Sequence, residues 1–109
     1  MNIIDITNNY FKYFSNKDIN SLKNYFAENI VLRDWNIFAD GKIEVIKANE
    51  EIFKSLNSIH VTPKKFYQDG LTVLCEIEIM INEKELLKVL DIIKFNEKKL
   101  IVEISAYKQ

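Results

Sequence analysis

Residues 59–107 decide the fold, and they read IHVTPKKFYQDGLTVLCEIEIMINEKELLKVLDIIKFNEKKLIVEISAY. Apolar runs, several of them alternating with polar residues, are separated by Asp69-Gly70, Asn82-Glu83-Lys84 and Asn96-Glu97-Lys98. Alternation is typical of a strand with one buried face, and Asp-Gly is a strong hairpin signal. The segment therefore predicts an antiparallel meander, in which Pro63 lies at a bulge or on an edge strand. The predicted strands are residues 59–67, 71–81, 86–95 and 100–107.

Two helices are predicted at the N-terminal end of the chain. Apolar residues recur at three- and four-residue steps over residues 3–15, which gives the first helix one apolar stripe. Asp18 is a good N-cap for a second helix, which we expect to end at Asn29. The inward residues are Ile3, Ile6, Tyr10, Tyr13 and Phe14 in the first helix, and Ile19, Leu22, Tyr25 and Phe26 in the second.

A strand, a short return and a third helix connect these helices to the meander. Residues 30–35 are predicted as a strand, and residues 36–40 as a return with a stub of strand at Ile37-Phe38. Asp40-Gly41 then precedes a helix over about residues 42–56. The order helix, helix, strand, helix and meander predicts an α+β domain, with helices packed on one face of a curved antiparallel sheet.

Length and charge exclude several classes of protein. The 109 residues fit one domain spanning 1–109, and a hydrophobic fraction of 48% is enough for a core without disulfides. The 15 basic and 16 acidic residues give a net charge of -1, so we expect neither a nucleic-acid nor a membrane partner. The N-terminus lacks a signal-peptide pattern and the apolar runs are too short to span a bilayer. We expect a cytoplasmic protein.

Cys75 and His60 are the only residues of their types. A single cysteine cannot form an intrachain disulfide, which is the usual condition of a protein in a reducing cytoplasm. Cys75 shares a predicted strand face with Val73 and Ile77, which favours a buried thiol over a nucleophile. His60 is predicted at the surface or a sheet edge. Because there is no Cys/His cluster, no metal site is expected.

Two aspartates lie among apolar residues where a strand would bury them. Asp34 is in register with Ile30 and Leu32, and Asp91 is in register with Val89. A buried carboxylate either finds hydrogen-bond donors or gives up its charge. The pair therefore indicates a pocket with acid/base chemistry. The alternative for Asp91 is a structural carboxyl group held by backbone or tyrosine donors.

The third predicted strand of the meander is apolar on both faces. Leu86, Leu90 and Ile92 alternate with Leu87 and Val89. An antiparallel sheet with one face in water would show a cleaner alternation of polar and apolar residues. We therefore expect the outer sheet face to be covered by a second copy of the chain, in a two-fold homodimer.

At this length and with this element order, the chain resembles the nuclear transport factor 2-like, or SnoaL-like, superfamily. That superfamily contains ketosteroid isomerases, polyketide cyclases, dehydratases and binding modules. The resemblance implies a cone-shaped, cystatin-like curved antiparallel sheet with three N-terminal helices packed on its concave face, a hydrophobic pocket inside and no cofactor. It rests on residues 10–18 leading into 26–29, on residues 31–34 followed by Gly41, and on residues 90–95 with 104–109.

Within the superfamily, the polar positions are most similar to those of ketosteroid isomerases. The resemblance implies that Asp34 is a general base, Tyr10 an oxyanion-hole donor and Asp91 a carboxylic acid kept protonated by burial. It implies a cofactor-free isomerase, cyclase or dehydratase that acts next to a carbonyl of a small molecule. The alternative is a non-catalytic ligand-binding or dimerisation module of the same fold.

Four further residues are candidates for ligand binding, namely Phe14, Trp35, Asn49 and Phe53, and the alternative for the three aromatic residues is a place in the core. Trp35 stands where those isomerases carry a small turn residue, so we expect a narrower pocket mouth. Asn49 stands where their third helix supplies a tyrosine, and it is a candidate partner for Tyr10 or for a ligand. Arg33, the only arginine, alternates to the face opposite Asp34 unless the strand bulges, and if it turned inward it would favour an anionic substrate. Given these departures from the isomerase pattern, a steroid is not the expected substrate.

Overall fold

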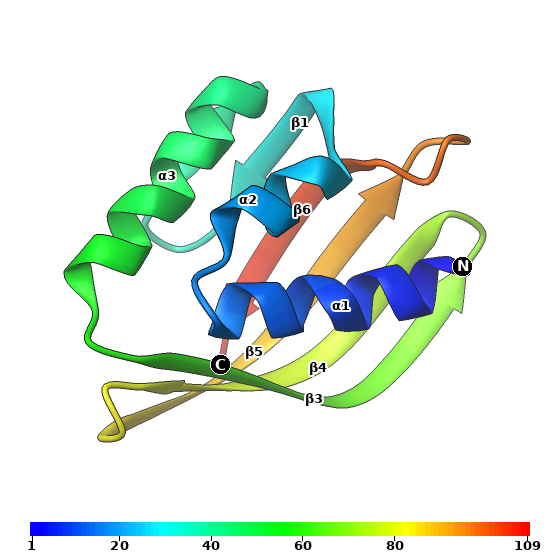
Figure 1. The fold of residues 1–109 in the computed structure, drawn as a ribbon. Coiled ribbons are helices and arrows are strands. Elements are labelled where there is room, and N and C mark those ends of the chain that lie inside the picture. Colours follow the sequence, from blue (N-terminus) through cyan, green and yellow to red (C-terminus); the bar gives the residue numbers. More distant parts are fainter.

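The helices lie together on one face of a six-stranded sheet, as Figure 1 shows. The computed structural model describes residues 1–109. The helices lack the combination of length and hydrophobicity that a membrane-spanning helix needs. The elements are α1 (Ile3–Ser15), α2 (Ile19–Leu22), a 3-10 turn η1 (Lys23–Tyr25), β1 (Phe26–Arg33), β2 (Phe38–Asp40), α3 (Lys42–Ser55), β3 (Ile59–Asp69), β4 (Thr72–Ile81), β5 (Glu85–Phe95) and β6 (Ile101–Lys108).

The predicted α+β architecture is confirmed. The sheet order is β2-β1-β6-β5-β4-β3, and strands β3 to β6 form the antiparallel meander. β1 joins the meander by pairing with β6 in parallel, while β2 pairs with β1 antiparallel. β3 is an edge strand, and its register shifts between Pro63 and Lys65, which agrees with the expected position of Pro63.

The second predicted helix is wrong over its C-terminal half. α2 ends at Leu22, and the chain has already entered β1 at Phe26 rather than at residue 30. The apolar residues that suggested a longer helix instead belong to a strand, in which Phe26 and Ile30 are both buried. Phe26 pairs with Ile101 of β6, a partner far along the chain that no local pattern reveals. Pairing across the sheet has overridden helix propensity at this point.

The end of the first strand also differs from its prediction. The last paired residue of β1 is Arg33, which lies opposite Phe38 of β2 and Ser105 of β6. Asp34 and Trp35 therefore belong to the connection between β1 and β2 rather than to the strand. The predicted stub of strand at residues 37–38 becomes residues 38–40.

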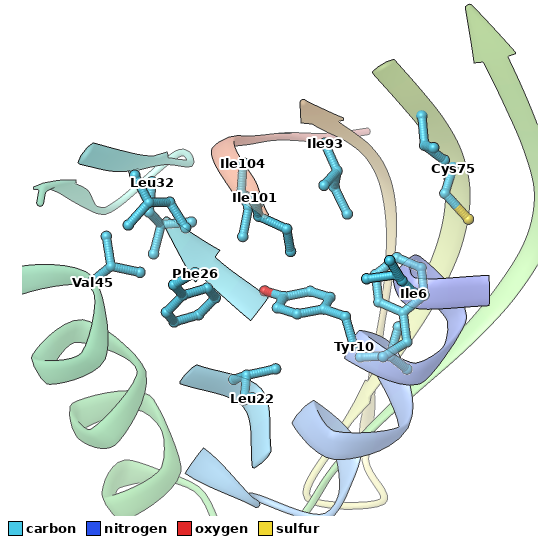
Figure 2. Close-up of a cluster of buried hydrophobic side chains, with 14 of the residues drawn as sticks. Ile6, Tyr10, Leu22, Phe26, Leu32, Val45, Cys75, Ile93, Ile101 and Ile104 are labelled. Atoms are coloured by element: carbon cyan, nitrogen blue, oxygen red, sulfur yellow. The ribbon is translucent and has the colours of Figure 1, made fainter. Parts of the chain in front are cut away.

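One core lies between the helices and the sheet. α1 packs on β3 and β4, and α3 packs on β1 and β2. Figure 2 shows Tyr10 extending from α1 into the interior among apolar side chains of the strands and Leu22 of α2. Cys75 is fully buried in this cluster, as its strand face predicted.

Ser15, at the end of α1, connects that helix to β3. Its hydroxyl donates to the carbonyl of Phe11 at 2.9 Å and accepts from the backbone N–H of Val61 at 2.9 Å. Ser55, at the end of α3, donates similarly to the carbonyl of Ile52 but is exposed and accepts nothing from the sheet.

We predict that Ser15→Ala lowers the free energy of unfolding by about 1–3 kcal/mol, because it leaves the N–H of Val61 without a partner. Ser55→Ala is the matched control and should change stability by less than about 0.5 kcal/mol. Urea denaturation followed by circular dichroism measures both. Equal losses in the two variants would contradict this account of how α1 is fixed to β3.

Candidate functional site

A small cavity of about 80 Å³ lies between α1, α3, the β1–β2 connection and the inner face of the sheet. Its lining is mostly apolar, with Tyr10, Asp34, Asn49 and Asp91 as the polar members. A larger hollow of about 1080 Å³ lies elsewhere and is lined by exposed residues such as Lys88. None of the polar residues of the small cavity lines that hollow, so the small cavity is the candidate site.

The cavity brings together six of the seven residues predicted for the site from the sequence. Phe14 and Trp35 line it with the four polar residues. Phe53 does not line it; its ring packs against the ring of Phe14 at 5.0 Å between centroids. The other lining residues were not predicted for the site. Most of them lie on predicted inward faces, but Phe11 lies outside the apolar stripe expected for the first helix, which included Tyr13 instead. These other lining residues are Phe11, Leu32, Ile52, Val61, Ile77, Ile79, Ile104 and Ala106.

Asp91 lies in the middle of β5, between Cys75 of β4 and Ala106 of β6. Only 7% of its surface is exposed, and its carboxyl group, which makes no hydrogen bond within the protein, is open to the cavity. Burial, together with the charge of Asp34, raises the pKa of Asp91 from 3.8 to about 7. The group is therefore poised to exist both as an acid and as a carboxylate near neutral pH.

Tyr10 reaches the same cavity from α1. The residue is 5% exposed, and its ring contacts those of Phe11 and Phe14 with centroids 5.6 and 6.0 Å away. Burial, and then the charges of Asp91 and Asp34, raise the pKa of the Tyr10 hydroxyl above its ordinary value of 10.0. The phenol therefore remains protonated and can donate a hydrogen bond into the cavity.

Asp34 reaches the cavity from the β1–β2 connection. Its Oδ1 accepts the backbone N–H groups of Asn36 and Ile37, each at 2.7 Å, and so holds the turn. The prediction that a strand would point this side chain inward is wrong, but the turn brings it to the cavity by another route. Asp34 therefore has a structural role as well as a place in the site.

Asn49 and Trp35 complete the polar and aromatic edges of the cavity. Asn49 is 1% exposed, and its Nδ2 donates to the carbonyl of Val45 at 3.1 Å rather than to Tyr10. Trp35 is 38% exposed, and the Nζ of Lys108 lies 5.3 Å from its ring centroid. Arg33 points away, with its guanidinium 5.1 Å from the ring of Phe38.

The cavity holds acidic groups without basic ones. No lysine, arginine or histidine is among its lining residues. No group of three or more His, Cys, Asp and Glu side chains lies close enough together to hold a metal ion. The chemistry available from these side chains is thus proton transfer and hydrogen bonding by two carboxyl groups, a phenol and an amide.

No protein-family model and no curated protein sequence matches this chain. Solved structures match over almost its whole length. A proposed isomerase of the SnoaL-like family from Agrobacterium tumefaciens superposes with a TM-score of 0.85 at 12% identity, covering 97% of this chain and 96% of that one. The chain has the nuclear transport factor 2-like fold. The resemblance seen in the sequence is confirmed at the level of the fold.

Two further structures show how widely the nuclear transport factor 2-like fold is shared. A proposed polyketide cyclase from Sinorhizobium meliloti has a TM-score of 0.84 at 17% identity, covering 97% of this chain and 99% of that one. A de novo designed protein with a curved β-sheet has a TM-score of 0.81 at 17% identity, covering 98% and 84%. Because a designed protein shares it, the fold alone does not determine a function.

The raised pKa of Asp91 makes a prediction for stability. Between about pH 4 and pH 7, Asp91 is protonated in the folded protein but ionised in the unfolded chain. Protonated Asp91 therefore contributes its full stabilisation below pH 4, and this contribution is lost as the pH rises through 7. Asp91→Asn removes this titration. We expect the stability of the wild type relative to this variant to fall by on the order of 4 kcal/mol from pH 4 to pH 8.

Urea midpoints of both proteins, measured across this pH range, test the prediction. Subtracting the two curves cancels the titrating groups that do not interact with Asp91, and any constant cost of burying the amide appears only as an offset. A difference that does not change with pH would show that Asp91 titrates alike in the folded and unfolded states.

Proposed function

We propose that this protein is a cofactor-free enzyme of the isomerase, cyclase or dehydratase kind, acting next to a carbonyl of a small organic substrate. One observation carries the proposal. Tyr10 and Asp91, two residues that are more than nine-tenths buried and whose polar groups make no hydrogen bond within the protein, line the same small cavity as Asp34. No sealed side-chain oxygen or nitrogen of the protein lacks a partner, so both groups are open to the cavity, where a ligand oxygen would bond to them.

In the proposed reaction, Asp34 is the general base. Its carboxylate takes a proton from the carbon next to the carbonyl, and the electron pair of that C–H bond moves to form an enolate. The enolate oxygen accepts hydrogen bonds from Tyr10 and from protonated Asp91, both preorganised by burial. Return of the proton to a different carbon completes an isomerisation and restores the carboxylate.

The size of the cavity limits the substrate. Pockets for drug-sized ligands are typically 300–1,000 Å³, whereas this cavity is about 80 Å³. A steroid does not fit this volume, in agreement with the expectation from the sequence. The proposed substrate is therefore a carbonyl compound of only a few non-hydrogen atoms, reached past Trp35.

A second candidate function is ligand binding without chemistry. It is favoured by the two hydrogen bonds of Asp34 Oδ1, which give that carboxylate a structural reason to be present. The two functions differ in one observable, since only the enzyme exchanges a carbon-bound proton of its ligand with solvent.

The proposal is tested by proton exchange. We predict that the protein accelerates deuterium incorporation next to the carbonyl of at least one member of a panel of small ketones in D₂O, measured by proton NMR. Asp34→Asn should lower the rate by roughly 10²–10⁴, since it removes the base while its amide oxygen can still accept from Asn36 and Ile37. Tyr10→Phe should lower it by roughly 10²–10³.

Tyr13→Phe is the matched control, because Tyr13 lies on α1 but does not line the cavity. Its exchange rate should equal that of the wild type. Exchange that persists in Asp34→Asn would remove the base from the mechanism, and ketone binding without any exchange would favour the second candidate function.

We also propose that the protein forms a homodimer through the outer sheet face. The hollow of about 1080 Å³ carries apolar Leu74 and Leu90 beside Tyr107, which is 58% exposed. Lysines and glutamates border it in comparable numbers, which allows two copies related by a two-fold axis to match opposite charges. Self-association through this face would cover the apolar side chains that the sequence leaves unexplained.

Leu90→Lys is predicted to convert the dimer to a monomer, because it places a buried charge at the centre of the interface. Ile43→Lys on α3, where the side chain is 70% exposed, is the control and should leave the dimer intact. Light scattering coupled to size-exclusion chromatography gives the mass of each. A monomeric wild type would contradict the dimer without bearing on the cavity.

A further inference from the structure

The cavity has the chemistry of a site for a positively charged ligand. Its only charged or chargeable lining groups are the carboxyls of Asp34 and Asp91 and the phenol of Tyr10. The remaining wall includes the rings of Phe11, Phe14 and Trp35. Aromatic faces and carboxylates both attract cations, and ionised carboxylates repel anions.

We propose that the cavity binds a small organic cation, an alkylammonium ion of a few carbon atoms, with ionised Asp91 as its buried counter-charge. The apolar wall suits the alkyl groups, and the rings of Tyr10, Phe14 and Trp35 suit the positive charge. A volume of about 80 Å³ selects ions of this size and excludes long-chain amines.

Asp91 is the observation that points to a ligand rather than to a merely acidic surface. It is 7% exposed, lines the cavity and makes no hydrogen bond within the protein. Burial raises the free energy of an ionised carboxylate in such surroundings, and a paired charge lowers it. A cation in the cavity supplies that charge, whereas no cationic side chain lines the cavity. A basic group near the cavity, the Nζ of Lys108, lies 5.3 Å from the ring centroid of Trp35.

The groups that face Asp91 determine whether the affinity for a cation rises or falls with pH. They are Asp34 from the β1–β2 connection, Tyr10 from α1 and Cys75 from β4, while the facing residue of β6 is Ala106. None of them is positively charged, and Asp34 raises the pKa of Asp91 further. Binding of a cation therefore favours the ionised form of Asp91 and releases a proton from the protein.

This inference uses the cavity of the proposed function but does not require catalysis. The ketone chemistry needs Asp91 protonated, whereas the cation needs Asp91 ionised. Affinity for a cation should therefore rise with pH over the range in which ketone exchange falls. Either activity can be absent while the other is present, so the two proposals fail separately.

Titration with tetramethylammonium chloride tests the inference. Binding is followed by the fluorescence of Trp35, the only tryptophan, and independently by broadening of the ligand methyl signal in NMR. We expect the dissociation constant to decrease about tenfold between pH 6 and pH 8, as the ionised fraction of Asp91 rises. tert-Butanol, a neutral molecule of similar size, should bind at least about tenfold more weakly at pH 8.

Two variants complete the experiment. Asp91→Asn should abolish the pH dependence and weaken binding of tetramethylammonium, and circular dichroism verifies its fold. Glu97→Gln, at the exposed β5–β6 turn, is the control for a change of net charge and should bind like the wild type. If Asp91→Asn fails to fold, the pH dependence and the tert-butanol comparison on the wild type still decide. Absence of binding by both readouts, equal affinity for tert-butanol, or affinity that falls with rising pH would each overturn the inference.

Discussion

The inner face of the β3–β6 meander has to be shielded from water, and the rest of the molecule is arranged around this constraint. Val73, Ile77 and Ile93 present a continuous apolar surface on a sheet that curves around it. α1 covers one side of that surface and α3, reached through β1 and β2, covers the other. The cover is incomplete at the middle of β5, and the space that remains is the cavity into which Asp91 faces. Packing thus creates both the fold and the unusual electrostatic setting of one carboxyl group.

Strong local periodicity explains which elements could be predicted from the sequence. α1, α3 and the meander each carry a sustained apolar pattern with a clear turn or cap at the ends, so their bounds agree with prediction to within a few residues. The helix expected to end at Asn29 failed, because the burial of Phe26 and Ile30 depends on β6, which lies about seventy residues further along the chain. Non-local pairing of this kind leaves no local signature.

The site was predictable in composition but not in geometry. Alternation along β5 identified Asp91 correctly as inward, because the strand is regular there. Asp34 was identified on a false premise, since its position depends on a turn that its own carboxylate stabilises rather than on strand alternation. Phe53 was misplaced because a helical stripe indicates the inner side of α3 but does not distinguish the cavity wall from the layer behind it. Similarity at 12–17% identity supports the fold and leaves the function to these side chains.

Both proposals for the cavity depend on one physical claim, namely that the Asp91 carboxyl titrates near neutral pH. The claim is tested most directly by following the side-chain carboxyl carbon of Asp91 by NMR as a function of pH, in protein labelled with ¹³C at aspartate. The structure predicts a midpoint of about 7, and a lower midpoint in Asp34→Asn, where the neighbouring negative charge is absent. A midpoint near 4 in the wild type would show that Asp91 is an ordinary carboxylate and would contradict the account of the site.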